Sequence, residues 1–232
     1  MISNMDIAGT GSVPAGEYDK VTIAGRGRVV GDIKSNRVDV SGMAKSTGKI
    51  ETEYLNVSGM FKSFNDINVS EKLEINGTAK CEGGINSNNI EINGTLKVAK
   101  NITFDTLISN GMLTMCGECE GRKFVGNGCT NIDGLLSADI IELELWRRST
   151  IKEIGGEEIR VRKRGGAFNF FNGKLISDVI EGDRVSLEGT IAKVVRGHNI
   201  EIGDECKIEK IEYTGELNIM GNCTVKEKIF IK

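Results

Sequence analysis

The residues best suited to chemistry in this sequence are three cysteines that lie close together. Cys116 and Cys119 have the CxxC spacing of many zinc ligands, and Cys129 follows them along the chain. In the repeat described below, Cys119 takes an inward position, whereas Cys116 and Cys129 take outward positions. Ligands on opposite faces of a strand cannot share one tetrahedral centre. We therefore expect structural thiols here and no metal site.

The single histidine, His198, lies in the sequence Arg-Gly-His-Asn, which is typical of a turn. Left-handed β-helix acyltransferases combine a catalytic histidine with hexapeptide repeats, and no six-residue phase is sustained in this chain. We therefore interpret His198 as an exposed loop residue.

Two acidic and two basic residues occupy equivalent places in neighbouring repeats. Glu74 and Glu91 share one position and could hold a cation, while Lys80 and Lys97 form a stack of the opposite sign. We interpret both as parts of a solvated, mixed-charge face. No glycine-rich phosphate loop leads into a helical pattern. The sequence thus predicts no catalytic residue, no cofactor and no enzyme activity, with a β-helix carbohydrate-active enzyme or carbohydrate-binding module as the alternative.

The strongest local charge is basic and consists of Arg147, Arg148, Arg160, Arg162, Lys163 and Arg164. Such a cluster could attract an anionic membrane surface or an acidic partner. It could equally keep the edge of an exposed hairpin from pairing with another strand. Both interpretations stay open at this point.

The element that must position all these residues is a repeat marked by glycine. Lines that start at Val21, Val38, Leu55, Leu73, Ile90, Leu107 and Phe124 have a glycine as their fifth residue, namely Gly25, Gly42, Gly59, Gly77, Gly94, Gly111 and Gly128. A line from Met5 adds Gly9, one residue short of the period, and the 55–72 line has one extra residue near Val69–Lys72. Regular spacing of about 17 residues indicates a repeat architecture.

Apolar residues within each line fall on odd positions, a period of two that predicts strands. Turns are expected at the glycines, which adopt positive φ without steric cost. Each line is therefore one coil of an all-β parallel solenoid, and the 232 residues correspond to a rod on the order of 60 Å long. We expect a regular solenoid over 1–145, a hairpin or hinge over 146–166 around Gly155-Gly156, and a looser solenoid over 167–232.

Composition and the terminal coils indicate where such a rod acts. The net charge is −3, and neither an export signal nor a membrane-spanning run is evident. Six cysteines then suggest reduced thiols in the cytoplasm. No capping helix is predicted, so end coils should expose unpaired backbone groups and the apolar residues Met5, Ile7, Ile219, Ile229 and Ile231. We expect end-to-end self-assembly, with no nucleic acid and no small-molecule substrate as a partner.

Several short phrases recur on these coils: VDVSG at 38–42, LNVSG at 55–59, LEINGT at 73–78, IEINGT at 90–95 and VSLEGT at 185–190. The array resembles the bactofilins, polymer-forming cytoskeletal proteins of bacteria, and is most similar to the longer members of Bacillus and Clostridium-type bacteria. The resemblance implies a right-handed β-helix and nucleotide-independent filaments that serve cell shape, division, motility or flagellar assembly. It also implies a cytoplasmic or membrane-peripheral location, with the protein itself, a paralogous bactofilin or a membrane surface as partner.

Overall fold

The computed structural model describes residues 3–164 and 173–232, and all the regular secondary structure in these residues is β-strand. The chain forms two compact units, Met1–Gly117 and Glu118–Lys232, which are described in turn. No helix in the described part of the chain is long and apolar enough to span a bilayer.

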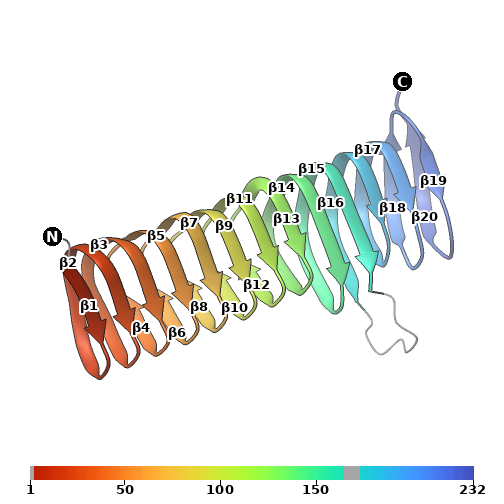
Figure 1. The fold of residues 1–232 in the computed structure, drawn as a ribbon. Helices are drawn as coiled ribbons and strands as arrows, with labels where there is room; N and C mark the ends of the chain where they lie inside the picture. Colours follow the sequence, from red (N-terminus) through yellow and green to blue (C-terminus); the bar gives the residue numbers. More distant parts are fainter. Residues whose placement is uncertain (1–2, 165–172) are drawn as a thin grey trace. The chain divides into compact units, whose positions relative to one another are not determined.

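The N-terminal unit is a stack of parallel coils (Figure 1). Its strands are β1 Ser3–Ile7, β2 Thr10–Ile23, β3 Arg26–Val40, β4 Met43–Ser46, β5 Ile50–Val57, β6 Met60–Ser63, β7 Ile67–Ile75, β8 Thr78–Cys81, β9 Ile85–Ile92, β10 Thr95–Val98, β11 Ile102–Ser109 and β12 Met112–Met115. Pairing joins each coil to the next, so the expected parallel β-solenoid is confirmed.

The register follows the glycine-marked lines. Backbone pairing aligns in succession Met5, Val21, Val38, Leu55, Leu73, Ile90 and Leu107. A register shift between Val69 and Lys72 holds the extra residue where the sequence predicts it. Alternate residues of each strand point inward and are buried, which makes one narrow core that runs through the unit.

The C-terminal unit repeats this design with coils of unequal length (Figure 1). Its strands are β13 Cys119–Gly126, β14 Cys129–Leu145, β15 Arg148–Lys163, β16 Lys174–Leu187, β17 Thr190–Ile202, β18 Lys207–Tyr213, β19 Leu217–Ile219 and β20 Thr224–Phe230. The register aligns Phe124, Ile141, Ile159, Val185, Ile200 and Leu217. All these pairings are parallel.

The hairpin expected around Gly155-Gly156 is wrong. Both glycines lie inside β15, which pairs in parallel with β14 on one side and with β16 on the other. Ile154 and Ile159, which flank them, are almost fully buried between neighbouring coils. Stacking these side chains removes apolar surface from water on two sides, which a local two-residue turn would not do.

The irregularity of this region lies after β15 and not within it. Ile159 aligns with Val185, so this coil is longer than its neighbours, and the additional chain lies between Lys163 and Lys174. The first residues of the looser solenoid expected over 167–232 fall outside the described residues, which resume at Gly173. A hinge role for 146–166 stays a prediction.

Candidate functional site

The inward side chains of the last described coil are only half covered. Leu217 pairs with Ile200, and Ile219 pairs with Ile202. Ile200 and Ile202 are almost fully buried, whereas Leu217 and Ile219 are half-buried. The core of the C-terminal unit therefore continues to this coil, and the described residues provide no further layer to cover it.

Four of the five residues predicted for the assembly interface lie buried or half-buried in the first or last coil, and Ile231 does not. Met5 and Ile7 lie in the first coil, half-buried and buried respectively, and Ile219 and Ile229 lie half-buried in the last. Ile231 departs from its expected inward position, because it is 44% exposed and lies in an outer groove of the C-terminal unit.

The departure begins before Ile231, because Ile229 pairs with Glu212, whose carboxylate lies on the outer surface beside Arg196. Phe230 pairs with Tyr213, and the two rings pack edge to face with their centroids 5.4 Å apart. The inward column that contains Ile211 thus continues at Lys228 and not at Ile229.

Glycine is required at the repeated corner of the N-terminal unit because the coils approach closely there. A Cβ on Gly25, Gly42, Gly59, Gly77, Gly94 or Gly111 would lie 2.0–2.1 Å from the carbonyl oxygen of the preceding glycine in the column. None of these residues has a positive φ. The expected reason for the column, backbone conformation, is therefore wrong, and steric contact between stacked coils is the actual one.

Gly9 begins this glycine column and differs from all its other members. Its N-terminal face is open, with no heavy atom within 4 Å of the place where its Cβ would stand. Its φ is not positive either. Within the described residues, neither space nor backbone conformation requires glycine at this position. Its carbonyl oxygen still accepts the Arg26 N–H at 2.8 Å, so the corner has the same form as the interior ones.

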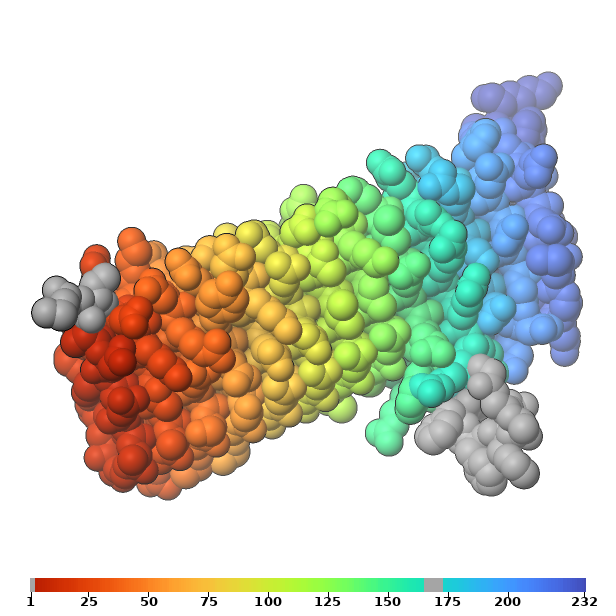
Figure 2. Space-filling view, in the orientation of Figure 1, coloured from red at the N-terminus to blue at the C-terminus, as the bar shows by residue number. Residues whose placement is uncertain are grey.

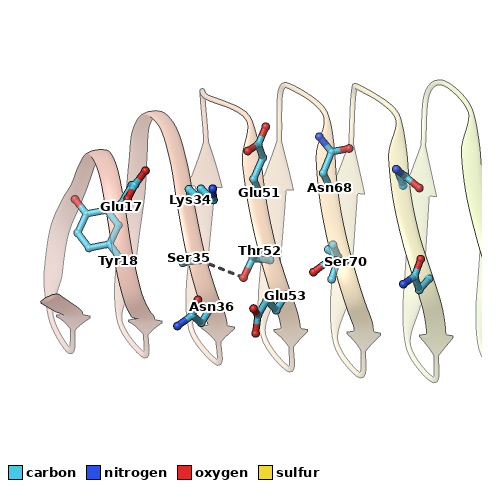
Figure 3. A pocket seen from close by; sticks show the side chains of 13 residues that line it. Glu17, Tyr18, Lys34, Ser35, Asn36, Glu51, Thr52, Glu53, Asn68 and Ser70 are labelled. Carbon is cyan, nitrogen blue, oxygen red and sulfur yellow. Dashed lines mark hydrogen bonds between the residues drawn. The ribbon is translucent and has the colours of Figure 1, made fainter. Parts of the chain in front are cut away.

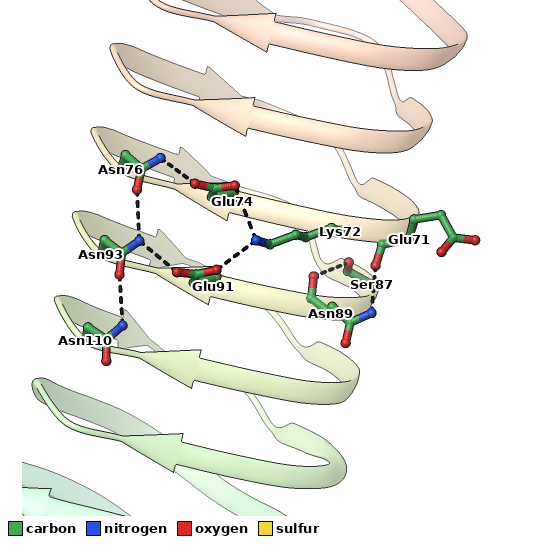
Figure 4. Close-up of polar contacts among 9 residues, drawn as sticks. All are labelled: Glu71, Lys72, Glu74, Asn76, Ser87, Asn89, Glu91, Asn93 and Asn110. Carbon is green, nitrogen blue, oxygen red and sulfur yellow. Dashed lines mark hydrogen bonds and ion pairs between the residues drawn. The ribbon is translucent and has the colours of Figure 1, made fainter.

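Polar ladders connect the coils on the outer surface of the same unit (Figure 4). The Asn93 side-chain amide donates to Asn76 Oδ1, and the Asn110 amide donates to Asn93 Oδ1, both at 2.9 Å. Beside them, Lys72 Nζ lies 3.4 Å from Glu74 Oε2 and 2.8 Å from Glu91 Oε2. The lysine therefore occupies the place between the two stacked carboxylates where a cation could have been held.

The pKa values in this ladder reflect the ion pair. A hydrogen bond from Lys72, followed by one from Asn93, lowers the pKa of Glu91 below its ordinary value. The reciprocal hydrogen bond to Glu91 raises the pKa of Lys72. Both charges are thus favoured in the folded state, and they tie neighbouring coils together.

Residues 6–102 match the Bactofilin family, described as polymer-forming cytoskeletal. This chain contains a bactofilin domain. It is 47% identical over 96 residues to the uncharacterized protein YhbF of Bacillus subtilis strain 168, and the match covers 41% of each chain. The uncharacterized protein YhbE of the same organism is 38% identical over 90 residues, which are 37% of this chain and 38% of YhbE. The match thus spans about two fifths of these relatives' length. No solved structure matches.

The bactofilin domain carries an open polar groove of about 600 Å³ on one stretch of its coils (Figure 3). Amides, hydroxyls and the carboxylates of Glu17, Glu51 and Glu53 line it. Ser35 Oγ donates to Thr52 Oγ1 at 3.1 Å in its floor. The face in view in Figure 2 shows no deep cleft in this domain. Such a groove could hydrogen-bond a polar chain but offers no enclosed reaction site.

The burial of Cys116, Cys119 and Cys129 follows their predicted positions in the coils. Cys119 is fully buried, and burial raises the pKa of its thiol, whereas Cys116 is exposed and Cys129 is half-buried. Burial also raises the pKa of Cys81 and of Cys206, each to about 11. Among residues 3–164 and 173–232, no three metal-ligating side chains come together.

His198 is exposed, as expected, but the expected turn is wrong, because the residue lies within β17; its Nδ1 lies 3.0 Å from Thr214 Oγ1. It borders the outer groove of the C-terminal unit, together with Arg196 and Glu212. Arg196 Nε donates to Glu212 Oε2 at 2.6 Å, so these charges are satisfied.

Local contacts balance much of the charge in the basic cluster around β15. Arg160 pairs with Glu158 and with Glu142, and Lys163 Nζ lies 2.5 Å from Glu205 Oε1. The Arg164 guanidinium stacks on the Trp146 ring, 3.5 Å from its centroid. Arg147, Arg148 and Arg162 are exposed. A partner for this cluster stays a prediction.

Lys80 and Lys97 belong to a longer basic row in the bactofilin domain than the two stacked lysines predicted from the sequence. The register extends this row through Lys62, Lys45 and Arg28. Reading the eighth residue of every glycine-marked line would have revealed it.

Proposed function

We propose that this protein is a structural scaffold that self-assembles end to end into filaments without nucleotide. The observation that carries the proposal is Gly9, which opens the glycine column yet has no described neighbour that requires a glycine. A coil of a second copy that stacked on it would supply the missing contact. The half-covered core of the last coil supports the same conclusion from the other end.

Backbone pairing and apolar burial supply the driving force in this scheme. Stacking a further coil on the first or last one would pair free backbone groups and cover Leu217 and Ile219. Burial contributes roughly 25 cal/mol for each Å² of apolar surface removed from water. Among the described residues, no glycine-rich loop leads into a helix, so nothing in them suggests a nucleotide requirement. The proposal assigns the filament to the cytoplasm, in support of cell shape, division or motility.

Substitution of Gly9 tests the proposal. Gly9→Val places a branched side chain on the open face, where the chain itself has room. We expect the variant to keep the parent's thermal midpoint while it loses sedimentable polymer, as judged by ultracentrifugation and negative-stain microscopy. Ile219→Lys should have the same effect from the opposite end.

Tyr54→Lys is the matched control for Ile219→Lys, because Tyr54 is exposed on the side of a middle coil. It should assemble like the parent. If Gly9→Val and Ile219→Lys both polymerise normally, end-to-end stacking is refuted.

The polar groove of Figure 3 supports a second candidate, a carbohydrate-binding module. This function would require that soluble oligosaccharides raise the thermal midpoint of the parent and that Glu51→Gln with Glu53→Gln abolish the shift. Absence of any shift over a panel of glycans would leave the scaffold as the sole function.

A further inference from the structure

The last two coils of the C-terminal unit place two free cysteines directly beside one another. Strands β18 and β20 pair in parallel from Lys207 and Thr224 onward. The residues directly before these two are Cys206 and Cys223, and both are free thiols. Parallel pairing therefore aligns the two cysteines across neighbouring coils, and we name them the terminal cysteine pair.

Both cysteine side chains belong to the inward column of their coils. Cys206 is buried, and its Sγ lies 3.3 Å from the Leu187 carbonyl oxygen. Two positions further along each strand, Ile208 pairs with Val225 and continues the same column. Cys223 is half-buried, because no described coil covers it. Burial raises the pKa of the Cys206 thiol to about 11, and the nearby Cys223 makes a smaller contribution in the same direction.

Three hydrogen bonds hold the two coils in register around the terminal cysteine pair. The Glu205 N–H donates to the Asn222 carbonyl oxygen at 2.8 Å, and the Asn222 N–H donates to Asp204 Oδ1 at 2.7 Å. On the other side of the pair, the Thr224 N–H donates to the Cys206 carbonyl oxygen at 2.8 Å. Glu205 is also the one non-glycine residue with a positive φ in the described part of the chain. Such strained backbone persists only where its surroundings fix it, so the corner before Cys206 is firmly held.

The spacing of the coils suits a disulfide at this place. Neighbouring parallel strands hold aligned Cα atoms about 4.8 Å apart. Disulfides join Cα atoms that are roughly 4.4–6.8 Å apart, so the bond requires no separation or approach of the two coils. The buried cysteines elsewhere have different neighbours. Cys81 pairs with Ser63 and Val98, and Cys119 pairs with Leu136.

We propose that the terminal cysteine pair is a reversible disulfide site that joins the last coil to the coil before it, with a low-molecular-weight disulfide such as oxidised glutathione as the oxidant. The thiolate of half-buried Cys223 attacks the small disulfide, which forms a mixed disulfide and releases one small thiolate. The Cys206 thiolate then attacks Cys223 Sγ, which forms the intramolecular bond and releases the second small thiolate. The two protons of the protein thiols pass through water to the released thiolates, so one small disulfide is reduced to two thiols. The oxidant itself does not reach Cys206, because the core encloses this residue.

The disulfide stabilises the coil that carries the half-covered Leu217 and Ile219. In the reduced protein this coil is held by pairing on one side only, so it is the part of the C-terminal unit that opens most readily. The bond closes the loop between residues 206 and 223 and restricts the opened chain. The last coil therefore stays folded under oxidising conditions, whether or not a second copy stacks on it.

Mass spectrometry without reducing agent tests the site. Trypsin cleaves after Lys207 and Lys210, between the two cysteines, so the disulfide joins two separate peptides. Incubation of the reduced full chain with oxidised glutathione should give this linked pair as the main product, and dithiothreitol should reverse it. Closure should become about tenfold faster for each pH unit below 11, because the attacking group is the Cys206 thiolate.

Two variants follow the steps of the reaction. Cys206→Ser should stop at a glutathione adduct on Cys223, whereas Cys116→Ser, which removes an exposed thiol elsewhere, should form the linked pair like the parent. A glutathione adduct on Cys223 as the end product of the parent would overturn the proposal. A bond between the Cys223 residues of two chains would do the same.

Hydrogen exchange measures the effect of the bond on one molecule before and after oxidation, so the result does not depend on the folding of a variant. Amides of residues 217–224 should exchange roughly 100-fold more slowly in the oxidised protein, while those of β8 should not change. The same comparison with Gly9→Val, which should not assemble, separates this effect from the stacking of copies. Equal exchange of residues 217–224 in the two redox states would overturn the proposal.

Discussion

The carbonyl oxygen of Gly9 lies 2.0 Å from the place where a Cβ on Gly25 would stand. Real Cβ atoms do not approach a carbonyl oxygen so closely, so the two coils could not keep their spacing if Gly25 had a side chain. The same contact recurs through the column and fixes the distance between coils at this corner.

Gly25→Ala should therefore destabilise the N-terminal unit by about 3 kcal/mol, because the coils must separate locally and lose backbone hydrogen bonds. Chemical denaturation followed by circular dichroism measures the change. Gly9→Ala is the control and should stay within about 1 kcal/mol of the parent, since its methyl group meets no described atom. Equal destabilisation by both would contradict the steric explanation.

The Lys72–Glu91 pair should give a small pH dependence of stability. The folded pKa of Glu91 is below its ordinary value of 4.5, so its contribution is present above that pH and is lost as the pH falls through the lowered pKa. Lys72 has a raised pKa, so its contribution is lost at the alkaline end, as the pH rises above 10.5. Both groups are partly exposed, so we expect less than about 1 kcal/mol.

Thermal midpoints measured against pH for the parent and for Glu91→Gln test this point. The variant should have a shallower acid limb than the parent. Identical acid limbs would mean that the pair does not contribute to folding.

Thiol reactivity should separate the cysteines by burial. Cys116 is exposed, whereas Cys81 and Cys206 are buried with pKa values raised to about 11. The thiolate is the reactive form, so a disulfide reagent at neutral pH should modify Cys116 first and reach the buried thiols only after unfolding. Mass spectrometry of timed samples identifies the modified residue. Early modification of Cys119, which is fully buried, would be incompatible with this coil register.

Ile154→Ala should destabilise the C-terminal unit by about 3 kcal/mol, because Ile154 is packed between Leu136 and Ile180. An exposed hairpin at this place would tolerate the change. Glu157→Ala, at an exposed position of the same strand, is the control and should have little effect. Denaturant midpoints of the two variants measure the difference.

The sequence predicts the N-terminal unit well because the repeat of about 17 residues indicates both the register of the coils and the burial of their side chains. The glycine spacing sets the register of the coils, and the alternation of residues such as Leu73 and Ile75 sets which side chains are buried. Even the extra residue near Val69–Lys72 can be placed, since the spacing on both sides is intact.

Local sequence could not predict β15 or the role of the glycine column. From local sequence alone, Gly155-Gly156 resembles a two-residue turn. Its parallel pairing with β14 and β16 depends on residues far away in the sequence. The contact between Gly25 and Gly9 is likewise a property of stacked coils and not of a single turn. Ile231 matches the period, but β20 pairs with β18 in a register that already aligns Ile229 with the outward Glu212.

The glycine column also has an evolutionary consequence. A gain or loss of one residue has to be absorbed by a local bulge, as it is near Val69–Lys72, whereas duplication or deletion of a whole line leaves all columns aligned without one. The length of this molecule can therefore change in steps of one complete turn, and each step would preserve the corner contacts, the asparagine ladder and the lysine row together. The lengths of related chains should therefore differ by whole coils.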